Sequence, residues 1–434
     1  METDRILFHS ILTRYCENVV GGSVTLASGG RVLWHENSGW ARLEPETPSS
    51  ASTQFRIGSI TKTFTAVCLL LLAEEGLLDV DSPIHEHVPE LGGIRATLRQ
   101  ILSHTSGLQR EHPSPMWETF EAPGAGEFEK TLRDVVQVSS PGLRWHYSNL
   151  GFGLLAEVVR RVVGSFEDFV EERLFRPLGL RDTTWAPREP FALGYYSDPY
   201  DERFMPDKIF NMRALSAAGQ LWSTSADIAR WAGALAGLRR EIVSPSVVEA
   251  MHVPHAMTNR EWTAAWGLGL ALRHRDGRVL SGHDGVMPGF TAAISLDRSS
   301  GTVAAALLNA GTGVDVIGLT DELVAAAVER SPSLDPAPRV RVPCPPELAG
   351  VLGRWWSEGL EFVFTWNEGT LRAVQAVSPG EPARFERTET NLLRVISGRE
   401  RGEVLEIVRD AAENVLFLRW AGYPFTRRPY QWDL

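Results

Sequence analysis

The sequence predicts an α+β fold in which one sheet is built from both ends of a long N-terminal domain. Strand-like segments bounded by turn residues occur before residue 45 and return after residue 265. Helix-like segments fill the stretch between them, a pattern that suits a sheet covered by helices. After a proline-rich stretch near residue 335, short strand-like segments follow at regular spacing. With 434 residues, the chain is long enough for two such domains.

The first predicted element is a hairpin over residues 22–42, because the turn Ser28-Gly29-Gly30 separates two strand-like runs. Residues 77–190 are expected to be mostly helical, with long loops. Three helices are predicted from composition and end signals: one that carries Lys62 and ends near Gly76, one over 150–163, and one that starts with the capping box Thr224–Asp227.

Strands return in the last third of the N-terminal domain. The predicted segments are 267–272, 289–296 and 302–308, each of strand length and bounded by turn residues. A helix rich in Val, Leu and Ala is expected at 314–329. This order places strands at both ends of the domain, with the helical part inserted between them.

Residues 331–346 are predicted to be a linker, because prolines at this density resist both helix and interior strand. The chain is therefore divided into a domain over 1–330 and a smaller one over 347–434. Six short strands are predicted in the smaller domain: 360–366, 370–374, 383–387, 392–396, 404–409 and 415–420. Their even spacing predicts a small antiparallel sheet or barrel.

Composition narrows the possible functions. The hydrophobic fraction of 43% and charged fraction of 22% are ordinary for a globular protein. A net charge of −11 argues against a nucleic-acid partner. The three cysteines Cys16, Cys68 and Cys344 show neither metal spacing nor a disulfide framework. No signal peptide and no apolar run long enough for a membrane span is evident, so a cytoplasmic protein without a membrane partner is expected.

The first chemical motif is Ser59-Ile60-Thr61-Lys62. On a helix, residues three positions apart share a face, so the Ser59 hydroxyl and the Lys62 amine would be neighbours. An alcohol is a poor nucleophile until a nearby base takes its proton, and a desolvated amine can do that. From the serine and lysine frequencies, a chance Ser-x-x-Lys match somewhere in the chain has a probability of roughly 0.2, so the motif alone is a hypothesis.

Two further motifs carry chemistry. Tyr147-Ser148-Asn149 offers a phenol that can transfer protons and an amide that can hold both an amine and a substrate carbonyl. The alternative is a tyrosine in the core or an interface. In Gly282-His283-Asp284-Gly285, the glycines would let substrate or backbone approach the histidine. The alternative there is a turn with an exposed histidine, in which Asp284 is a turn residue.

Taken in order, Ser-x-x-Lys, Tyr-x-Asn and His-x-Gly resemble the serine β-lactamase and penicillin-binding-protein superfamily. The resemblance is to the class C-like branch with esterases and D-aminopeptidases, and covers roughly residues 8–330. Supporting stretches are 102–108, 177–180 and 219–224. The resemblance implies a β-lactamase/transpeptidase-like domain, with an antiparallel sheet flanked by helices and a helical subdomain.

The resemblance also implies roles for the motif residues. Ser59 would be the acylated nucleophile, and Lys62 and Tyr147 would share the proton transfers, with the identity of the base left open. Asn149 would position Lys62 and the substrate carbonyl. The backbone N–H groups of Ser59 and Val286 would form the oxyanion hole. No metal or organic cofactor is expected.

His283 departs from the pattern of β-lactamases and DD-peptidases, which usually have Lys-Thr-Gly at this place. A histidine is mostly neutral at pH 7 and binds a substrate carboxylate more weakly, which disfavours efficient β-lactam hydrolysis.

The segment after residue 346 resembles the lipocalin-like accessory domain of some of these hydrolases. It would either stabilise or dimerise the protein, or form a wall or lid over the site.

The expected function is a serine hydrolase or acyltransferase acting through acyl-Ser59 on an ester, thioester or peptide-like substrate, D-residues included. Some relatives that resemble this two-domain plan are penicillin-binding-protein-type thioesterases, which release a carrier-delivered nonribosomal peptide as a macrocycle. The alternatives are a carboxylesterase, a D-aminopeptidase and, from another class, a non-catalytic sensor. Water and an amine differ only as the second nucleophile, so the sequence does not separate hydrolysis from cyclisation.

Overall fold

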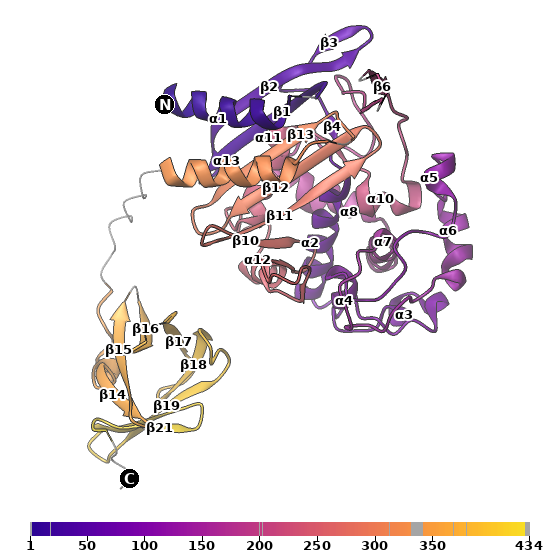
Figure 1. The fold of residues 1–434 in the computed structure, drawn as a ribbon. Coiled ribbons are helices and arrows are strands. Elements are labelled where there is room, and N and C mark those ends of the chain that lie inside the picture. The colour runs from indigo at the N-terminus through magenta and orange to yellow at the C-terminus, as the bar shows by residue number, and fades with distance from the viewer. Residues whose placement is uncertain are drawn as a thin grey trace. The chain divides into compact units, whose positions relative to one another are not determined.

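The computed structural model describes residues 2–17, 19–198, 200–201, 203–311, 313–330, 342–367, 369–378 and 380–429. The chain forms two compact units, Met1–Ser331 and Pro332–Leu434 (Figure 1). Most of the predicted linker, residues 331–341, lies outside the described residues. Each unit is therefore considered by itself.

The first unit contains a nine-stranded antiparallel sheet in the order β3-β2-β1-β13-β12-β11-β10-β9-β8. Its strands are β1 (Gly21–Ser28), β2 (Arg31–Leu43), β3 (Glu46–Pro48), β8 (Ala256–Met257), β9 (Ala264–Trp266), β10 (Ala271–Arg275), β11 (Arg278–Met287), β12 (Phe290–Asp297) and β13 (Thr302–Leu308). The two ends of the unit meet where β1 pairs with β13, with Val24 opposite Ala306. This confirms the predicted sheet built from both ends.

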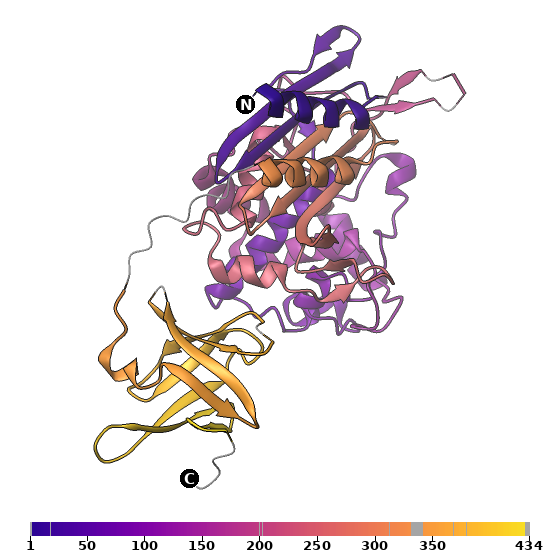
Figure 2. The ribbon, with the colours of Figure 1, turned by 60° about the vertical axis from the view of Figure 1, so that its left-hand side comes forward.

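Helices cover both faces of the sheet. On one face, α1 (Glu2–Tyr15) and α13 (Val316–Arg330) lie side by side, as Figures 1 and 2 show. Because side chains alternate along a strand, Ala304 and Ala306 of β13 pack toward these two helices, whereas Ala305 and Leu307 face the larger core on the other side. Burial on both faces explains why this strand is a continuous apolar run.

The larger core is organised around α2 (Thr61–Glu74), whose residues Thr61–Leu72 are all buried. A helix that is buried on every side needs no polar face, which fits its run of leucines. Phe64 stacks on Trp231 with ring centroids 3.9 Å apart, and the Trp231 indole N–H donates to Thr63 Oγ1 at 2.7 Å. These contacts fix the rotation of the helix that carries Lys62.

The remaining elements of the first unit surround α2. The helices are α3 (Ile84–His87), α4 (Leu98–Leu102), α5 (Met116–Thr119), α6 (Ala125–Thr131), α7 (Asn149–Val163), α8 (Phe166–Val170), α9 (Arg176–Leu178), α10 (Ser216–Gly219), α11 (Ser225–Leu235) and α12 (Pro245–His252). Single turns of tighter or wider helix are η1 (Gly58–Ile60), η2 (Pro89–Leu91), η3 (Leu132–Asp134), η4 (Glu171–Phe175) and η5 (Arg213–Leu215). Two small sheets pair β4 (Phe55–Arg56) with β7 (Trp222–Ser223) and β5 (Tyr195–Ser197) with β6 (Phe204–Pro206).

Three local predictions need correction. The predicted strand 267–272 is mostly a turn between β9 and β10, in which the Gly267 N–H donates to Leu270 O at 2.8 Å. Asp284 is not a turn residue, because it lies within β11 opposite Ala293. Only half of the predicted capping box is present, because Thr224 Oγ1 accepts from Asp227 N, whereas the Asp227 carboxylate accepts from Asp182 N.

The second unit contains α14 (Pro346–Ala349) and an eight-stranded antiparallel sheet in sequential order. Its strands are β14 (Gly353–Ser357), β15 (Leu360–Asn367), β16 (Thr370–Gln375), β17 (Ala383–Arg387), β18 (Leu392–Ser397), β19 (Val404–Arg409), β20 (Val415–Trp420) and β21 (Tyr423–Phe425). Trp356 and Thr426 exchange backbone hydrogen bonds of 2.8 and 2.9 Å, which link the first strand to the end of the last. The sheet is therefore a nearly closed barrel, as predicted, with β14 and β21 added to the six expected strands.

No helix in the described ranges combines the length and the apolar character that a membrane crossing requires.

Candidate active site

Ser59 lies in η1, the short turn that leads directly into α2. Gly58 before it has a φ of +51°, a conformation that favours glycine, and a Cβ at this position would lie 2.9 Å from the backbone N of Val286. The Lys62 Nζ lies 2.9 Å from the Ser59 Oγ. The side chains of Ser59 and Lys62 are therefore neighbours, as their i, i+3 spacing predicts, although Ser59 itself precedes the α-helix.

Lys62 is fully buried and makes contact with three oxygen atoms. Besides Ser59, its Nζ donates to Asn149 Oδ1 at 2.7 Å and to the backbone O of Ala218 at 2.6 Å. Burial lowers the pKa of the Lys62 amine to about 7, although the nearby carboxylates of Glu111 and Asp284 oppose the shift. A neutral amine has two N–H donors and one lone pair, so it can serve Asn149 and Ala218 and still accept the Ser59 proton.

Tyr147 lies beside this amine, with its ring centroid 4.9 Å from Lys62 Nζ. Burial raises the pKa of the Tyr147 phenol well above its usual range, and interaction with the Ser59 hydroxyl only partly opposes this. His104 packs on the phenol with centroids 4.1 Å apart, and its Nδ1 accepts from Ser148 N at 3.1 Å. The phenol is thus held in place and protonated in the free protein.

Asn149 is the first residue of α7, whose N-terminus is capped by the Ser148 hydroxyl accepting from Gly151 N at 2.9 Å. Its amide faces Lys62 on one side and Glu111 on the other, where its Nδ2 donates to Glu111 Oε1 at 2.6 Å. The second oxygen, Glu111 Oε2, is buried and has no hydrogen-bond partner among the described residues. Glu111 was not predicted from the sequence, because it lies in a loop without a recognisable motif.

His283 is 2% exposed, which rules out the alternative of an exposed histidine in a turn. Its Nδ1 lies 2.5 Å from the Asp284 backbone O and must therefore donate to it. Burial lowers the pKa of His283 to about 4, so the ring is neutral at pH 7. It packs against Trp266 and Tyr147, at centroid distances of 5.2 and 6.3 Å. On the strand, the adjacent Asp284 borders the cavity beside Ser59.

The end of β11 approaches the nucleophile turn backbone to backbone. A Cβ on Gly285 would lie 1.9 Å from Ile57 O and 3.1 Å from Ser59 N, so only glycine fits. Ser59 and Val286 both border the same cavity. The structure thus brings together the two residues whose N–H groups were predicted to form an oxyanion hole.

The cavity at Ser59 has a volume of about 710 Å³. Three carboxylates and one guanidinium border it, from Glu111, Asp207, Asp284 and Arg110. Its aromatic lining comes from Trp117, Trp145, Tyr147, Tyr196 and Trp266. Across the described ranges, no group of three or more His, Cys, Asp or Glu residues is arranged to hold a metal ion.

Comparisons with known proteins agree with this architecture. A family model described as Beta-lactamase matches residues 9–328, and a second, described as a domain of unknown function (DUF7586), matches residues 344–427. The chain is similar to penicillin-binding protein 4* of Bacillus subtilis (strain 168), with 28% identity over 295 residues. That match covers 62% of this chain and 64% of the relative, so the chain spans less than two thirds of the relative's length.

Two solved structures illustrate the similarity in fold. A D-stereospecific amidohydrolase from Streptomyces sp. has 27% identity and a TM-score of 0.61, with 74% of this chain and 98% of that chain covered. A structure of SurE has 25% identity and a TM-score of 0.61, with 98% of both chains covered. The first match extends over about three quarters of the chain and the second over nearly all of it.

Proposed function

The chain belongs to the Beta-lactamase family, and from this premise we propose that it is a serine acyl-transfer enzyme that works through an acyl-Ser59 intermediate. The observation that carries the proposal is the 2.9 Å contact between Ser59 Oγ and the buried amine of Lys62. Because the pKa of this amine is lowered to about 7, a large share of it is neutral at physiological pH and can accept a proton.

In the acylation step, Ser59 Oγ attacks the acyl carbonyl carbon as its proton passes to Lys62 Nζ. The carbonyl π-bond opens to an oxyanion, which the N–H groups of Ser59 and Val286 stabilise. When the tetrahedral intermediate collapses, the bond to the leaving alcohol, thiol or amine breaks. The proton returns to the leaving group from Lys62, either directly or through the Tyr147 hydroxyl.

We assign the base role to Lys62 and a proton-relay role to Tyr147. A phenol with a raised pKa is protonated in the free enzyme and so cannot accept the first proton. Asn149 is a positioning residue, because its Oδ1 holds the amine of Lys62. His283 is also a positioning residue, because it packs behind Tyr147 without bordering the cavity.

Deacylation reverses these proton transfers with a second nucleophile. Water gives a free acid, whereas an amine of the same acyl chain gives a macrocycle. Lys62 would take the proton of either nucleophile, and Ser59 would recover it as the ester bond breaks. Thioesterase and cyclase activities therefore need no residue beyond those already named.

The charge of the cavity favours a substrate with an ammonium group. The carboxylates of Glu111, Asp207 and Asp284 outnumber the single guanidinium of Arg110 on its lining. A peptidyl ester, amide or thioester with a free amine fits this balance, whether it arrives alone or on a carrier protein. The D-stereospecific amidohydrolase among the similar structures supports the inclusion of D-residues.

A D-aminopeptidase is the second candidate, because the same carboxylates could hold the ammonium of a D-aminoacyl amide. A product screen separates the candidates. Its substrates are a p-nitrophenyl ester, a D-phenylalanyl amide and a peptidyl thioester with a free N-terminus, and the products are analysed by mass spectrometry. A cyclic product identifies a cyclase, a linear peptide acid identifies a thioesterase, and a free D-amino acid identifies an aminopeptidase.

Labelling with a fluorophosphonate tests the shared premise. The expected result is one adduct on Ser59, absent from Ser59→Ala. If Ser59 stays unmodified under conditions that label a control esterase, the proposed acyl-Ser59 enzyme is wrong, and the alternative of a non-catalytic sensor is favoured.

A further inference from the structure

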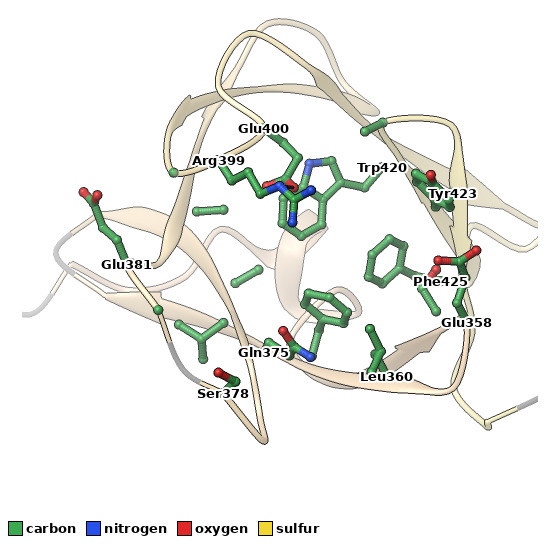
Figure 3. Close-up of a pocket in the computed structure, with 18 residues that line it drawn as sticks. Glu358, Leu360, Gln375, Ser378, Glu381, Arg399, Glu400, Trp420, Tyr423 and Phe425 are labelled. Carbon is green, nitrogen blue, oxygen red and sulfur yellow. Dashed lines mark ion pairs between the residues drawn. The ribbon is translucent and has the colours of Figure 1, made fainter. Parts of the chain in front are cut away.

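Carboxylates border two cavities in the described part of the chain. The cavity in the barrel has a volume of about 540 Å³ (Figure 3). Its Glu400 lies 3.7 Å from Arg399, and Figure 3 shows the carboxylate of Glu381 directed away from the ring of strands. The other cavity, of about 710 Å³, lies beside Ser59, so a charge there acts on the reacting groups. The charges of this second cavity are therefore compared one by one.

Arg110 and Glu111 form a pair at the Ser59 cavity. Arg110 Nε lies 3.5 Å from Glu111 Oε1, and the same oxygen accepts from Asn149 Nδ2 at 2.6 Å. The other oxygen, Glu111 Oε2, is buried, with almost no exposed surface that a ligand could contact. Glu111 therefore contributes charge to the cavity but offers no free oxygen to a ligand.

Asp207 is the carboxylate that follows β6. Its Oδ1 accepts from Lys208 N at 2.8 Å, and its own N–H donates to Gly194 O at 2.8 Å. The charge of Asp207 does not act on the pKa of the Lys62 amine, whereas that of Asp284 raises it. Asp207 therefore has less influence on the reacting atoms than Asp284 has.

Asp284 is the carboxylate that remains available beside the nucleophile. It is partly exposed and borders the cavity together with Ser59 and Val286. Within the described ranges, no hydrogen bond or ion pair joins its carboxylate to another residue, and both of its oxygens keep exposed surface. A carboxylate without a partner in a cavity of low dielectric attracts a cation and repels an anion.

The surroundings of Asp284 indicate which part of a substrate it would meet. It follows His283, whose ring packs on Tyr147 with centroids 6.3 Å apart. Asp284 raises the pKa of the Tyr147 phenol more than Glu111 does. For the amine of Lys62 the order is reversed, because Glu111 raises its pKa more than Asp284 does. Asp284 thus lies toward the phenol, which in the proposed acylation step passes the proton to the leaving group.

On the premise of the proposed acyl-Ser59 function, we propose that Asp284 selects substrates whose leaving group carries an ammonium group. The carboxylate pairs with this ammonium while the acyl group passes to Ser59. Because the second nucleophile enters where the leaving group departed, the same carboxylate favours an acyl acceptor that carries an ammonium group besides its nucleophilic atom. The substrate class is therefore an acyl ester, thioester or amide of an amino alcohol, amino thiol or diamine.

Three thioesters test this, with thiol release followed by 5,5′-dithiobis(2-nitrobenzoic acid). S-Butyrylthiocholine carries a quaternary ammonium on the leaving thiol. S-(3,3-Dimethylbutyl) thiobutyrate has the same shape, with carbon in place of the nitrogen. S-(3,3-Dimethylbutyl) 4-(trimethylammonio)thiobutyrate carries the ammonium on the acyl chain instead. Each value of kcat/KM is divided by that of the neutral thioester in the same protein, so that a change in the pKa of Lys62 cancels.

Asp284→Asn removes the charge and keeps the shape of the side chain. The ratio for S-butyrylthiocholine should fall by about tenfold, whereas the ratio for the thioester with a charged acyl chain should change by less than about threefold. Asp276→Asn is the matched control, because Asp276 lies in the exposed turn between β10 and β11 and does not border the cavity. It should keep both wild-type ratios.

The proposal is wrong if folded Asp284→Asn keeps the wild-type ratio for S-butyrylthiocholine. It is also wrong if both cationic thioesters lose equally, because the carboxylate then does not act on the leaving group. In either case, turnover of the neutral thioester would leave the acyl-Ser59 function intact. Circular dichroism verifies folding, and Asp284→Thr, whose side chain suits a strand, replaces an Asp284→Asn variant that does not fold.

Labelling of Ser59 gives a second readout, which needs no turnover. Choline should slow labelling by a fluorophosphonate more than 3,3-dimethylbutan-1-ol does, and the difference should vanish in Asp284→Asn. An equal effect of the two alcohols on wild type would overturn the role of Asp284. A complete failure to label Ser59 would instead overturn the proposed function, and this inference with it.

Discussion

The amine of Lys62 and the hydroxyl of Ser59 lie 2.9 Å apart at the start of α2, and the amine has no exposure to solvent. Asn149 and the backbone of Ala218 supply the other two acceptors around this nitrogen. The environment therefore combines strong desolvation, which favours a neutral amine, with fixed partners that orient its lone pair toward the hydroxyl. Both properties are needed in a base that activates serine.

Replacing either member of the pair should abolish turnover. Ser59→Ala removes the nucleophile, and Lys62→Arg installs a guanidinium that stays protonated and cannot accept a proton. Each is expected to lower kcat/KM for the best ester substrate by about 10⁴-fold or more. Circular dichroism verifies that the variants are folded. Ready turnover by folded Ser59→Ala would show that the nucleophile is elsewhere.

The pH profile should report the Lys62 amine. Its pKa is lowered to about 7, and only the neutral form of the amine, which predominates above that pH, can accept the Ser59 proton. The value of kcat/KM should therefore rise with pH along a limb whose midpoint lies near pH 7. A profile measured between pH 5 and 9 on an uncharged ester checks this. An activity that is flat across this range would mean that another group is the base.

Much of the fold could be predicted because the strands are marked at both ends. Residues 302–308 follow Gly301 and are buried on both faces, so the strand appears as one apolar run between turn residues. In contrast, β11 was missed because Gly282 and Gly285 resemble a turn. These glycines are in the strand for a tertiary reason, since a Cβ at either one would collide with a neighbouring backbone oxygen.

The motif residues of the site could be found from the sequence, but its surroundings could not. Ser59, Lys62 and Asn149 occur in motifs, and the structure joins them by hydrogen bonds. Glu111 and Asp207 come from loops far apart in the sequence and reach the cavity through the folding of the helical region. The burial of Lys62, which sets its pKa, is likewise a property of the packed core.

Removing the charge of Glu111 should shift the pH profile. Its carboxylate raises the pKa of Lys62, so Glu111→Gln should lower that pKa and move the acidic limb of kcat/KM to lower pH. The glutamine Oε1 can still accept from Asn149 Nδ2, which preserves the positioning contact. The same titration on Glu46→Gln, an exposed carboxylate of β3, should reproduce the wild-type midpoint. A limb that moves to higher pH would contradict this electrostatic role.

The close approach of β11 to the nucleophile turn should not tolerate a side chain. In Gly285→Ala, the new Cβ would lie 1.9 Å from Ile57 O and 3.1 Å from Ser59 N, so strand and turn must separate. Separation misplaces the N–H groups of Ser59 and Val286 relative to a shared oxyanion, so kcat/KM should fall by about 10²-fold or more. Gly93→Ala is the matched control, because a Cβ there would meet nothing within 4 Å. A Gly285→Ala variant that is folded and fully active would contradict this prediction. Kinetics and thermal melts of both variants therefore decide whether this contact shapes the oxyanion hole.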